Sequence, residues 1–172
     1  SVAFPDGRVE QATVAGVDAA GDLAVLDVDT AGATPIEWSD AAPDDGSVVF
    51  GASAGRRGSR VSLGMVSGTD RAFRGPRGRL ISGSVEHTAP LARGSSGGPL
   101  VDRRGRLVGV NTHRLGEGFY LAVTADESLR ERVDALAAGR SPSPLTLGVA
   151  IAAPHVARRL RASVGLADRE YS

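Results

Sequence analysis

The sequence predicts a mainly β fold in which helical segments appear only beyond residue 124. Short apolar runs of strand length recur along the chain, and clusters of glycine, proline and aspartate separate them. Two of these runs, Pro99–Val101 and Leu107–Val110, flank a polar segment that contains Gly105, which is typical of a β-hairpin. Many short strands joined by tight turns favour a β-barrel architecture.

The expected strands fall into two groups. Residues 1 to 31 carry short strands with turn signals at Pro5-Asp6-Gly7 and Ala20-Gly21. Residues 32–45 contain Trp38, are rich in alanine, proline and aspartate, and should connect the two groups. The second group, within residues 46–139, has enough strands to form a barrel, with expected strands at 48–51, 60–67 and 80–83 and the hairpin at 99–112.

A helix is expected to follow the last strand. Thr124-Ala125-Asp126-Glu127 has the form of a capping box, in which the threonine would be the N-cap. Leu129, Val133 and Leu136 form one apolar stripe, and Gly139 suits the C-terminal stop. Residues 140–144 read as a linker because serine and proline alternate there.

Composition indicates a folded chain without a nucleic-acid partner. The sequence has 172 residues, 41% of them hydrophobic, and its formal net charge is zero. A chain of this size can bury one sizeable core or two small ones, whereas binding to phosphates would need a clustered positive charge. The sequence has no cysteine, so no disulfide framework is expected.

The segment Gly94-Ser95-Ser96-Gly97-Gly98-Pro99-Leu100 contains the candidate nucleophile, Ser96. A serine hydroxyl reacts only when a base accepts its proton and N–H groups stabilise the oxyanion that forms. The peptide N–H groups of Gly94 and Ser96 are the expected oxyanion hole, and the glycines that follow keep the approach of a substrate free of Cβ atoms. The alternative is a flexible Gly/Ser loop without a catalytic role.

Here the chain resembles the high-temperature-requirement (HtrA/Deg) branch of the trypsin-like serine peptidases. Members of that branch show G-N-S-G-G-P-L, a hairpin, G-x-N-T and then G-x-x-x-A-[IV]. This sequence has the first motif with Ser95 in place of asparagine, then Gly109-Val110-Asn111-Thr112 and Gly118–Val123. The resemblance implies a chymotrypsin/trypsin-like double β-barrel whose N-terminal barrel is incomplete in residues 1–31.

Asp22 is the candidate for the aspartate of a Ser-His-Asp triad. It opens the run Asp22-Leu23-Ala24-Val25-Leu26, which is similar to the D-L-A-[VL]-L motif of the same branch, and Val14-Ala15-Gly16-Val17-Asp18 precedes it. The resemblance implies that Asp22 orients the catalytic histidine. The alternative, an ordinary turn aspartate before a strand, would be favoured without the serine motif.

The histidine of the triad has no match in this sequence. The branch places it some thirty residues before the aspartate, and no histidine precedes Asp22. His87, His113 and His155 all follow it, and for each of them we expect an exposed or structural role. We therefore expect the chain to begin after its catalytic histidine and to be inactive as given.

Substrate recognition is expected along one strand edge and in one pocket. Thr112, His113 and Arg114 would pair with the substrate backbone by β-augmentation. Phe119 and Tyr120, with residues 87–93, would form the wall of the primary pocket, that is, the pocket for the side chain before the cleaved bond. No acidic residue is evident at its floor, so small or apolar side chains are the expected preference.

Residues 145–172 are similar to the opening of a PDZ domain. Leu147-Gly148-Val149 matches its L-G-V strand, and Val156, Leu160 and Val164 have helical spacing after Pro154. We therefore expect the chain to end inside that domain.

The resemblance implies a serine endopeptidase that acts on peptides or unfolded proteins outside the cytoplasm and is compatible with a homo-oligomer. No metal or cofactor is implied. The alternative is a catalytically silent homologue that binds peptides, and an unrelated β-barrel binding module is disfavoured by the ordered motifs. A histidine about thirty residues upstream of Asp22 would distinguish the enzyme from the silent homologue.

Overall fold

The computed structural model describes residues 1–55, 58–75, 80–142, 159 and 162–163. Residues Ser1–Pro142 form one compact unit, and all of the structure that follows lies within it. The predicted start of a PDZ domain, residues 145–172, lies outside the described residues except for three isolated positions.

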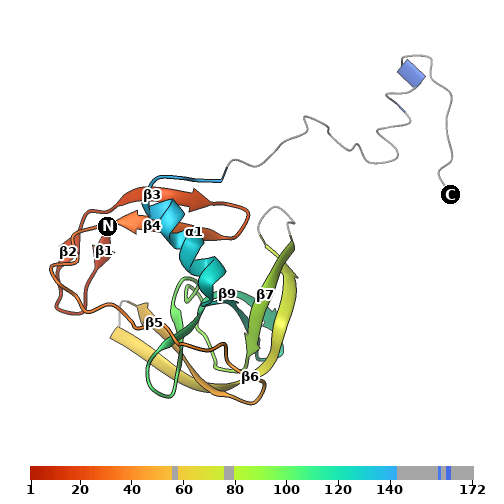
Figure 1. The fold of residues 1–172 in the computed structure, drawn as a ribbon, viewed down its shortest axis with the longest axis horizontal. Coiled ribbons are helices and arrows are strands. Elements are labelled where there is room, and N and C mark those ends of the chain that lie inside the picture. Colours follow the sequence, from red (N-terminus) through yellow and green to blue (C-terminus); the bar gives the residue numbers. More distant parts are fainter. Residues whose placement is uncertain (56–57, 76–79, 143–158, 160–161, 164–172) are drawn as a thin grey trace. The chain divides into compact units, whose positions relative to one another are not determined.

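A closed antiparallel barrel of six strands dominates this unit and confirms the predicted mainly β class (Figure 1). The strands pair around the barrel in the order β10-β7-β6-β5-β8-β9. Their bounds are Val48–Gly55 (β5), Gly58–Arg74 (β6), Leu80–His87 (β7), Pro99–Asp102 (β8), Leu107–Gly116 (β9) and Phe119–Thr124 (β10). The expected strands and the hairpin are all present, although β5, β6, β7 and β9 are longer than predicted.

The barrel interior is filled by small branched and aliphatic side chains. The main cluster of buried residues comprises Val49, Val66, Val85, Leu100, Val108 and Ala122. These residues come from all six strands, so each strand contributes an inward-facing position to one core. Register shifts between β6 and β7 and within the β9–β10 pair mark β-bulges, which let the long strands bend around this core.

The first 27 residues form two separate strand pairs. Val2–Ala3 (β1) pairs with Val9–Glu10 (β2), and Thr13–Asp18 (β3) pairs with Leu23–Asp27 (β4). The β3–β4 hairpin packs against the C-terminal helix (Figure 1). Gly16 makes the closest approach, because a Cβ atom at this position would lie 2.5 Å from the carbonyl oxygen of Leu136.

The helix α1 spans Glu127–Ala137, and its N-cap differs from the prediction. The N-cap is Asp126, whose carboxylate accepts a 2.8 Å hydrogen bond from the peptide N–H of Leu129. Thr124 instead belongs to β10, where its hydroxyl donates to the carbonyl of Gly83 at 2.6 Å. The helix therefore begins two residues later than a capping box at Thr124 would place it. The predicted stop is confirmed, since Gly139 adopts a φ of 76°.

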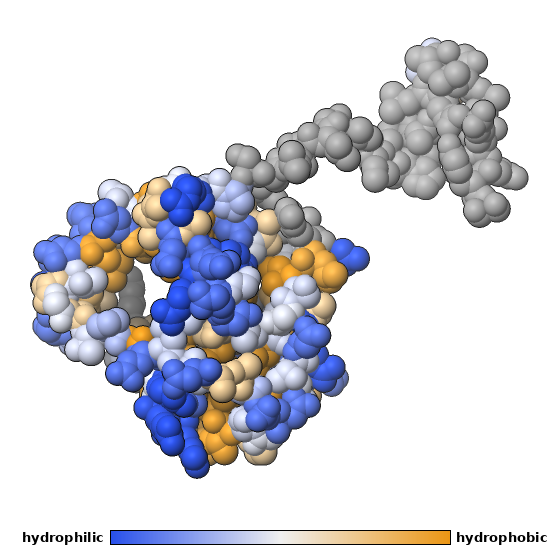
Figure 2. Space-filling model, viewed as in Figure 1, coloured by the Kyte–Doolittle hydropathy of each residue, from blue (hydrophilic) through white to orange (hydrophobic). Residues whose placement is uncertain are grey.

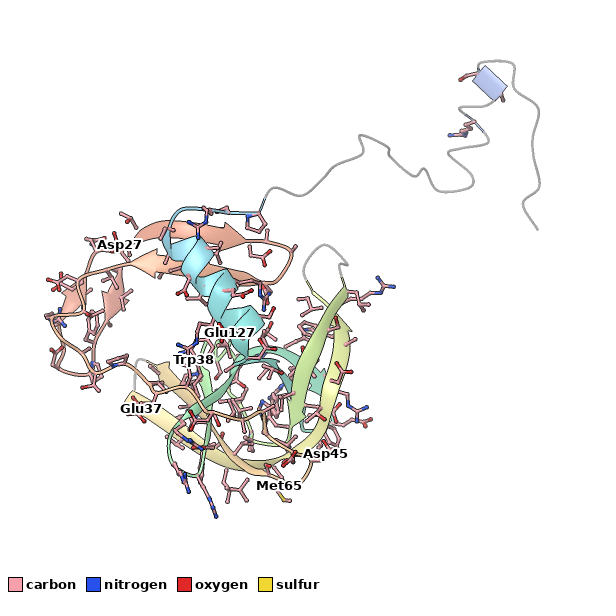
Figure 3. All side chains as sticks on the ribbon, in the orientation of Figure 1. Asp27, Glu37, Trp38, Asp45, Met65 and Glu127 are labelled. Carbon is pink, nitrogen blue, oxygen red and sulfur yellow. The ribbon has the colours of Figure 1, made fainter. Side chains whose placement is uncertain are left out.

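The connector between β4 and β5 is attached to the barrel at Trp38. This residue forms a β-bridge with Leu107, and the Arg130 guanidinium of α1 lies 4.5 Å from the centre of its indole ring. In Figure 3 the labelled Trp38 lies between α1 and the barrel. The connector therefore joins the helix to the hairpin β8–β9.

Apolar surface is visible along the lower side of the barrel in Figure 2. The large apolar side chains exposed on β5 and β6 are Val48, Val61, Leu63 and Met65. Within the described residues, no helix is both long and apolar enough to span a membrane.

Candidate active site

The predicted nucleophile lies in a tight double turn between β7 and β8. Gly94 and Gly97 have φ values of 83° and 84°, which a residue with a side chain rarely adopts, so the turns require glycine. Within this loop the N–H of Gly98 donates to the carbonyl of Ser95 at 3.0 Å. The loop exposes Ser96 and buries Ser95, so it presents one hydroxyl to solvent and hides the other.

Asn111 on β9 holds this loop through backbone and side-chain hydrogen bonds. Its backbone accepts from the N–H of Gly97 at 2.7 Å and donates to the carbonyl of Gly98 at 2.9 Å. Its side-chain N–H groups donate to the carbonyls of Gly98 at 3.0 Å and Pro99 at 3.2 Å. Because Asn111 is buried, these bonds fix the backbone on the C-terminal side of Ser96.

His87 completes the support of Asn111. The Asn111 amide oxygen lies 2.9 Å from His87 Nε2, and since the amide N–H groups donate elsewhere, this nitrogen is the donor. His87 is fully buried and stacks on Tyr120 with ring centres 5.7 Å apart. Its Nδ1 has no partner among the described residues, and burial lowers the pKa of the imidazole. His87 is thus a neutral structural histidine.

The predicted aspartate lies at the tip of the β3–β4 hairpin. Asp22 adopts a φ of 55°, in the left-handed region that aspartate tolerates better than most residues. The turn before it is organised by Asp18, whose carboxylate accepts from the N–H groups of Ala20 and Gly21 at 3.1 and 2.9 Å. The Arg132 guanidinium of α1 lies 3.7 Å from the same carboxylate. The helix therefore helps to position Asp22.

Thr112 brings the two predicted catalytic residues together. Its hydroxyl donates to the Asp22 carboxylate at 2.7 Å, and its carbonyl accepts from the Ser96 hydroxyl at 2.9 Å. Thr112 is the extra residue of a β-bulge, since β10 pairs Leu121 with His113 and Ala122 with Asn111. A bulge re-aims a side chain that regular pairing would direct elsewhere. Asp22, Thr112 and Ser96 thus form one cluster at the barrel rim.

The predicted substrate-binding residues follow Thr112 on β9 or lie on the paired strand β10. His113 is exposed and stacks on Phe73, with ring centres 5.6 Å apart. Arg114 is exposed, and its Nη2 donates to the carbonyl of Leu91 at 3.0 Å and to the hydroxyl of Tyr120 at 2.9 Å. Phe119 is 36% exposed, whereas Tyr120 is buried. The N–H groups of Gly94 and Ser96, predicted as the oxyanion hole, belong to the turn that presents the hydroxyl.

Neither described imidazole forms a hydrogen bond with Ser96 or Asp22. His87 bonds to Asn111, and His113 stacks on Phe73. His155 lies outside the described residues. Among those residues, no group of three or more acidic or histidine side chains is placed to hold a metal ion.

Three supporting contacts were missed by the sequence analysis. Thr112 was expected at the substrate edge and not as the partner of Asp22, and neither the His87–Asn111 bond nor the Asp18–Arg132 pair was foreseen. The step from Asp18 to Asp22, with Gly21 inside it, carries an aspartate-turn signal that would have found the Asp18 turn. All three contacts join distant segments, and no local pattern marks them.

The family model described as "Trypsin-like peptidase domain" matches residues 1–110. The chain belongs to the trypsin-like peptidase family. Among curated relatives, serine endoprotease DegS of Escherichia coli (strain K12) is 36% identical over 114 residues, which cover 64% of this chain and 32% of that protein. Serine protease PepD of Mycobacterium tuberculosis is 30% identical over 173 residues, which cover 88% of this chain and 36% of that protein.

Solved structures of this family share the fold. The structure titled "HtrA-type protease AlgW with decapeptide" superposes with a TM-score of 0.73 at 26% identity and covers 97% of this chain and 52% of that one. A serine endoprotease from Yersinia pestis gives 0.64 at 29% identity, covering 78% of this chain and 47% of that one. The trypsin-like fold and the HtrA homology are thereby confirmed. The chain spans about a third of the length of the curated relatives it matches.

Proposed function

We propose that this chain carries the nucleophile and the aspartate of an HtrA-type serine endopeptidase. The observation that carries this proposal is the Asp22–Thr112–Ser96 cluster, in which residues 90 and 16 positions apart meet through two hydrogen bonds of 2.7 and 2.9 Å. A flexible Gly/Ser linker would not hold one exposed serine close to the carboxylate at the tip of the β3–β4 hairpin. The family motifs around both residues support the same assignment.

In this mechanism the Ser96 hydroxyl attacks the carbonyl of the scissile peptide bond. A base removes its proton, and the N–H groups of Gly94 and Ser96 stabilise the tetrahedral oxyanion. Collapse of this intermediate expels the amine and leaves an acyl group on Ser96, which water then hydrolyses. The base is a histidine oriented by Asp22, and we propose that residues other than the 172 of this sequence supply it.

The silent homologue that binds peptides is the second candidate. The same cleft would hold a peptide against β9, and no bond would be cleaved. The absence of an imidazole next to Ser96 among the described residues favours this candidate for the chain alone. We further propose peptides or unfolded proteins as ligands, a location outside the cytoplasm and a PDZ domain beginning near residue 145, all supported by the family resemblance.

Labelling with a fluorophosphonate probe tests the assignment of the nucleophile. The protein joined to the residues that precede it in its reading frame should be labelled at one serine and should cleave a casein substrate. Ser96→Ala should abolish both, whereas the matched variant Ser95→Ala should retain most activity because the hydrogen bonds of Ser95 in the loop are made by its backbone N–H and carbonyl. The 172-residue chain itself should label many orders of magnitude more slowly.

Three results would contradict the proposal. If Ser95→Ala lost labelling and Ser96→Ala kept it, the nucleophile would be Ser95 and the proposed assignment would be wrong. Rapid stoichiometric labelling of Ser96 in the 172-residue chain would show that a base already present here activates it. Absence of labelling together with retained peptide binding would establish the silent homologue.

A further inference from the structure

Arg114 occupies an unusual place beside the candidate nucleophile. It follows Thr112 by two residues on β9, and its Nη2 donates to the carbonyl of Leu91, five residues before Ser96. The guanidinium therefore bridges the strand edge next to the Ser96 hydroxyl and the loop that leads to Ser96. This is the region predicted to accept the side chain that precedes the cleaved bond.

Tyr120 fixes the guanidinium from one side. The tyrosine hydroxyl accepts from the same Nη2 at 2.9 Å, and the guanidinium carbon lies 5.1 Å from the centre of the ring. Tyr120 is itself buried and stacks on His87, so the platform under the cation is rigid. A planar cation held by two acceptors and an aromatic face has lost much of its rotamer freedom before any ligand arrives.

Among the described residues, the Arg114 guanidinium has unused N–H donors and no carboxylate partner. A guanidinium carries five N–H donors, and the two contacts of Arg114 use only those of Nη2. Its Nε and Nη1 groups have no partner among the described residues, and no described carboxylate forms an ion pair with it. Arg106 and Arg132, by contrast, pair with Asp102 and Asp18.

We propose that Arg114 determines the specificity of the cleft and selects a carboxylate side chain, aspartate or glutamate, immediately before the cleaved bond. The inference rests on the proposed function and refines its substrate class. Adjacent Nε and Nη groups match the two oxygens of a carboxylate, and the contact with Tyr120 holds the guanidinium in place for such a pair. This preference differs from the one for small or apolar side chains, which the lack of an acidic residue at the pocket floor suggested.

Binding of product-like peptides tests this specificity without requiring turnover. Acetylated tripeptides that end in glutamate, glutamine or alanine are titrated into the ¹⁵N-labelled chain, and the amide shifts of residues 94–96 report occupancy of the site. The glutamate peptide should bind about tenfold more tightly than the glutamine peptide, and salt should reduce the difference. Arg114→Gln should make the two affinities equal, while Arg104→Gln, a change at an exposed arginine in the β8–β9 turn, should preserve the preference.

Each contrary result has a distinct meaning. Equal affinities for glutamate and glutamine peptides in the unmodified chain, with residues 94–96 still responding, would overturn the inference and leave the peptide cleft intact. Tightest binding of the alanine peptide would show that Arg114 fills the pocket and excludes side chains. Absence of any shift at residues 94–96 with every peptide would overturn both the inference and the proposed cleft.

Discussion

Two polar side chains inside the barrel determine how the Ser96 loop is held. Asn111 makes three side-chain hydrogen bonds, two to loop carbonyls and one with His87, and both residues are buried. Buried polar groups are costly unless they are paired, so this arrangement persists only while each member keeps its partner. Protonation of His87 would place a positive charge where the described residues provide no carboxylate.

Stability should therefore depend on the charge of His87. Burial lowers the pKa of His87 below its usual value of 6.5, so the folded state resists a proton that the unfolded chain binds. The unfolded state then binds more protons as the pH falls below 6.5, and the free energy of unfolding should decrease there by at most about 1.4 kcal/mol per pH unit.

Urea unfolding between pH 8 and about pH 5 measures this effect. His87→Gln is the matched control, because glutamine keeps an N–H donor for Asn111 and does not titrate. The difference in stability between the two proteins should change with pH in favour of the variant as the pH falls. A difference that stays constant across this range would show that His87 titrates alike in the folded and unfolded states.

At the same scale, local motifs predicted Ser96 and Asp22 as site residues because their glycine and strand contexts lie within a few residues of them. The role of Thr112 was not accessible in this way. Its hydroxyl reaches Asp22 because β10 pairs on either side of it and leaves it in a bulge, which depends on strand register. His87 was expected to be exposed or structural, and the structure decides between these because β7 places it inside the barrel.

The helix α1 is the element that fixes the position of the Asp22 hairpin. Leu136 is 1% exposed and its backbone contacts Gly16 on β3, while Arg132 lies beside Asp18 in the turn before Asp22. The carboxylate thus depends on a helix that follows it by more than a hundred residues. Helical periodicity predicted α1 and its stop, but the partner of its apolar face is a tertiary contact that no periodicity identifies.

Truncation of Leu136 should loosen the hairpin. Leu136→Ala should lower the free energy of unfolding by about 2–5 kcal/mol, because it leaves a cavity between α1 and β3. Leu26 on β4 is 49% exposed, so Leu26→Ala should change the free energy of unfolding by about 0.5 kcal/mol or less. Urea denaturation gives both values. Equal effects of the two substitutions would show that α1 does not anchor the hairpin.

The whole described unit combines a closed barrel with smaller strand pairs at its N-terminal end. In the barrel each strand has a neighbour on both sides, whereas β1 and β2 pair only with each other over two residues. Closed barrels leave no free strand edge, and this difference should appear as a difference in local stability.

Native-state hydrogen exchange should show this gradient. Amides of residues 61–67 in β6 and 107–112 in β9 should exchange most slowly, because both segments belong to the closed barrel and contribute Val66 and Val108 to its core. Amides of β1 and β2 should exchange fastest among the described strands, and those of β3 and β4 should be intermediate because α1 covers them. Protection of β1 and β2 equal to that of β9 would show that all strands open as one unit.

The sequence was sufficient for the class of this fold and for the approximate places of its strands, because apolar runs and turn residues are local signals. The length of β6, which runs from Gly58 to Arg74, was not predicted because polar residues interrupt the apolar pattern in its second half. Bulges carry the strand through this half, and they become visible only with the pairing to β7.

The packing of the β3–β4 hairpin on α1 affects the order in which contacts form during synthesis on the ribosome. The segment with Asp22 emerges early, the barrel follows, and α1 is completed only after every strand of the barrel has been made. Domains acquire their contacts as the chain lengthens, so Asp22 obtains its final support last. A nascent chain with a finished barrel therefore still has an Asp22 hairpin without the helix that positions it, and the Asp22–Thr112–Ser96 cluster gains its full support only after residue 137 has been made.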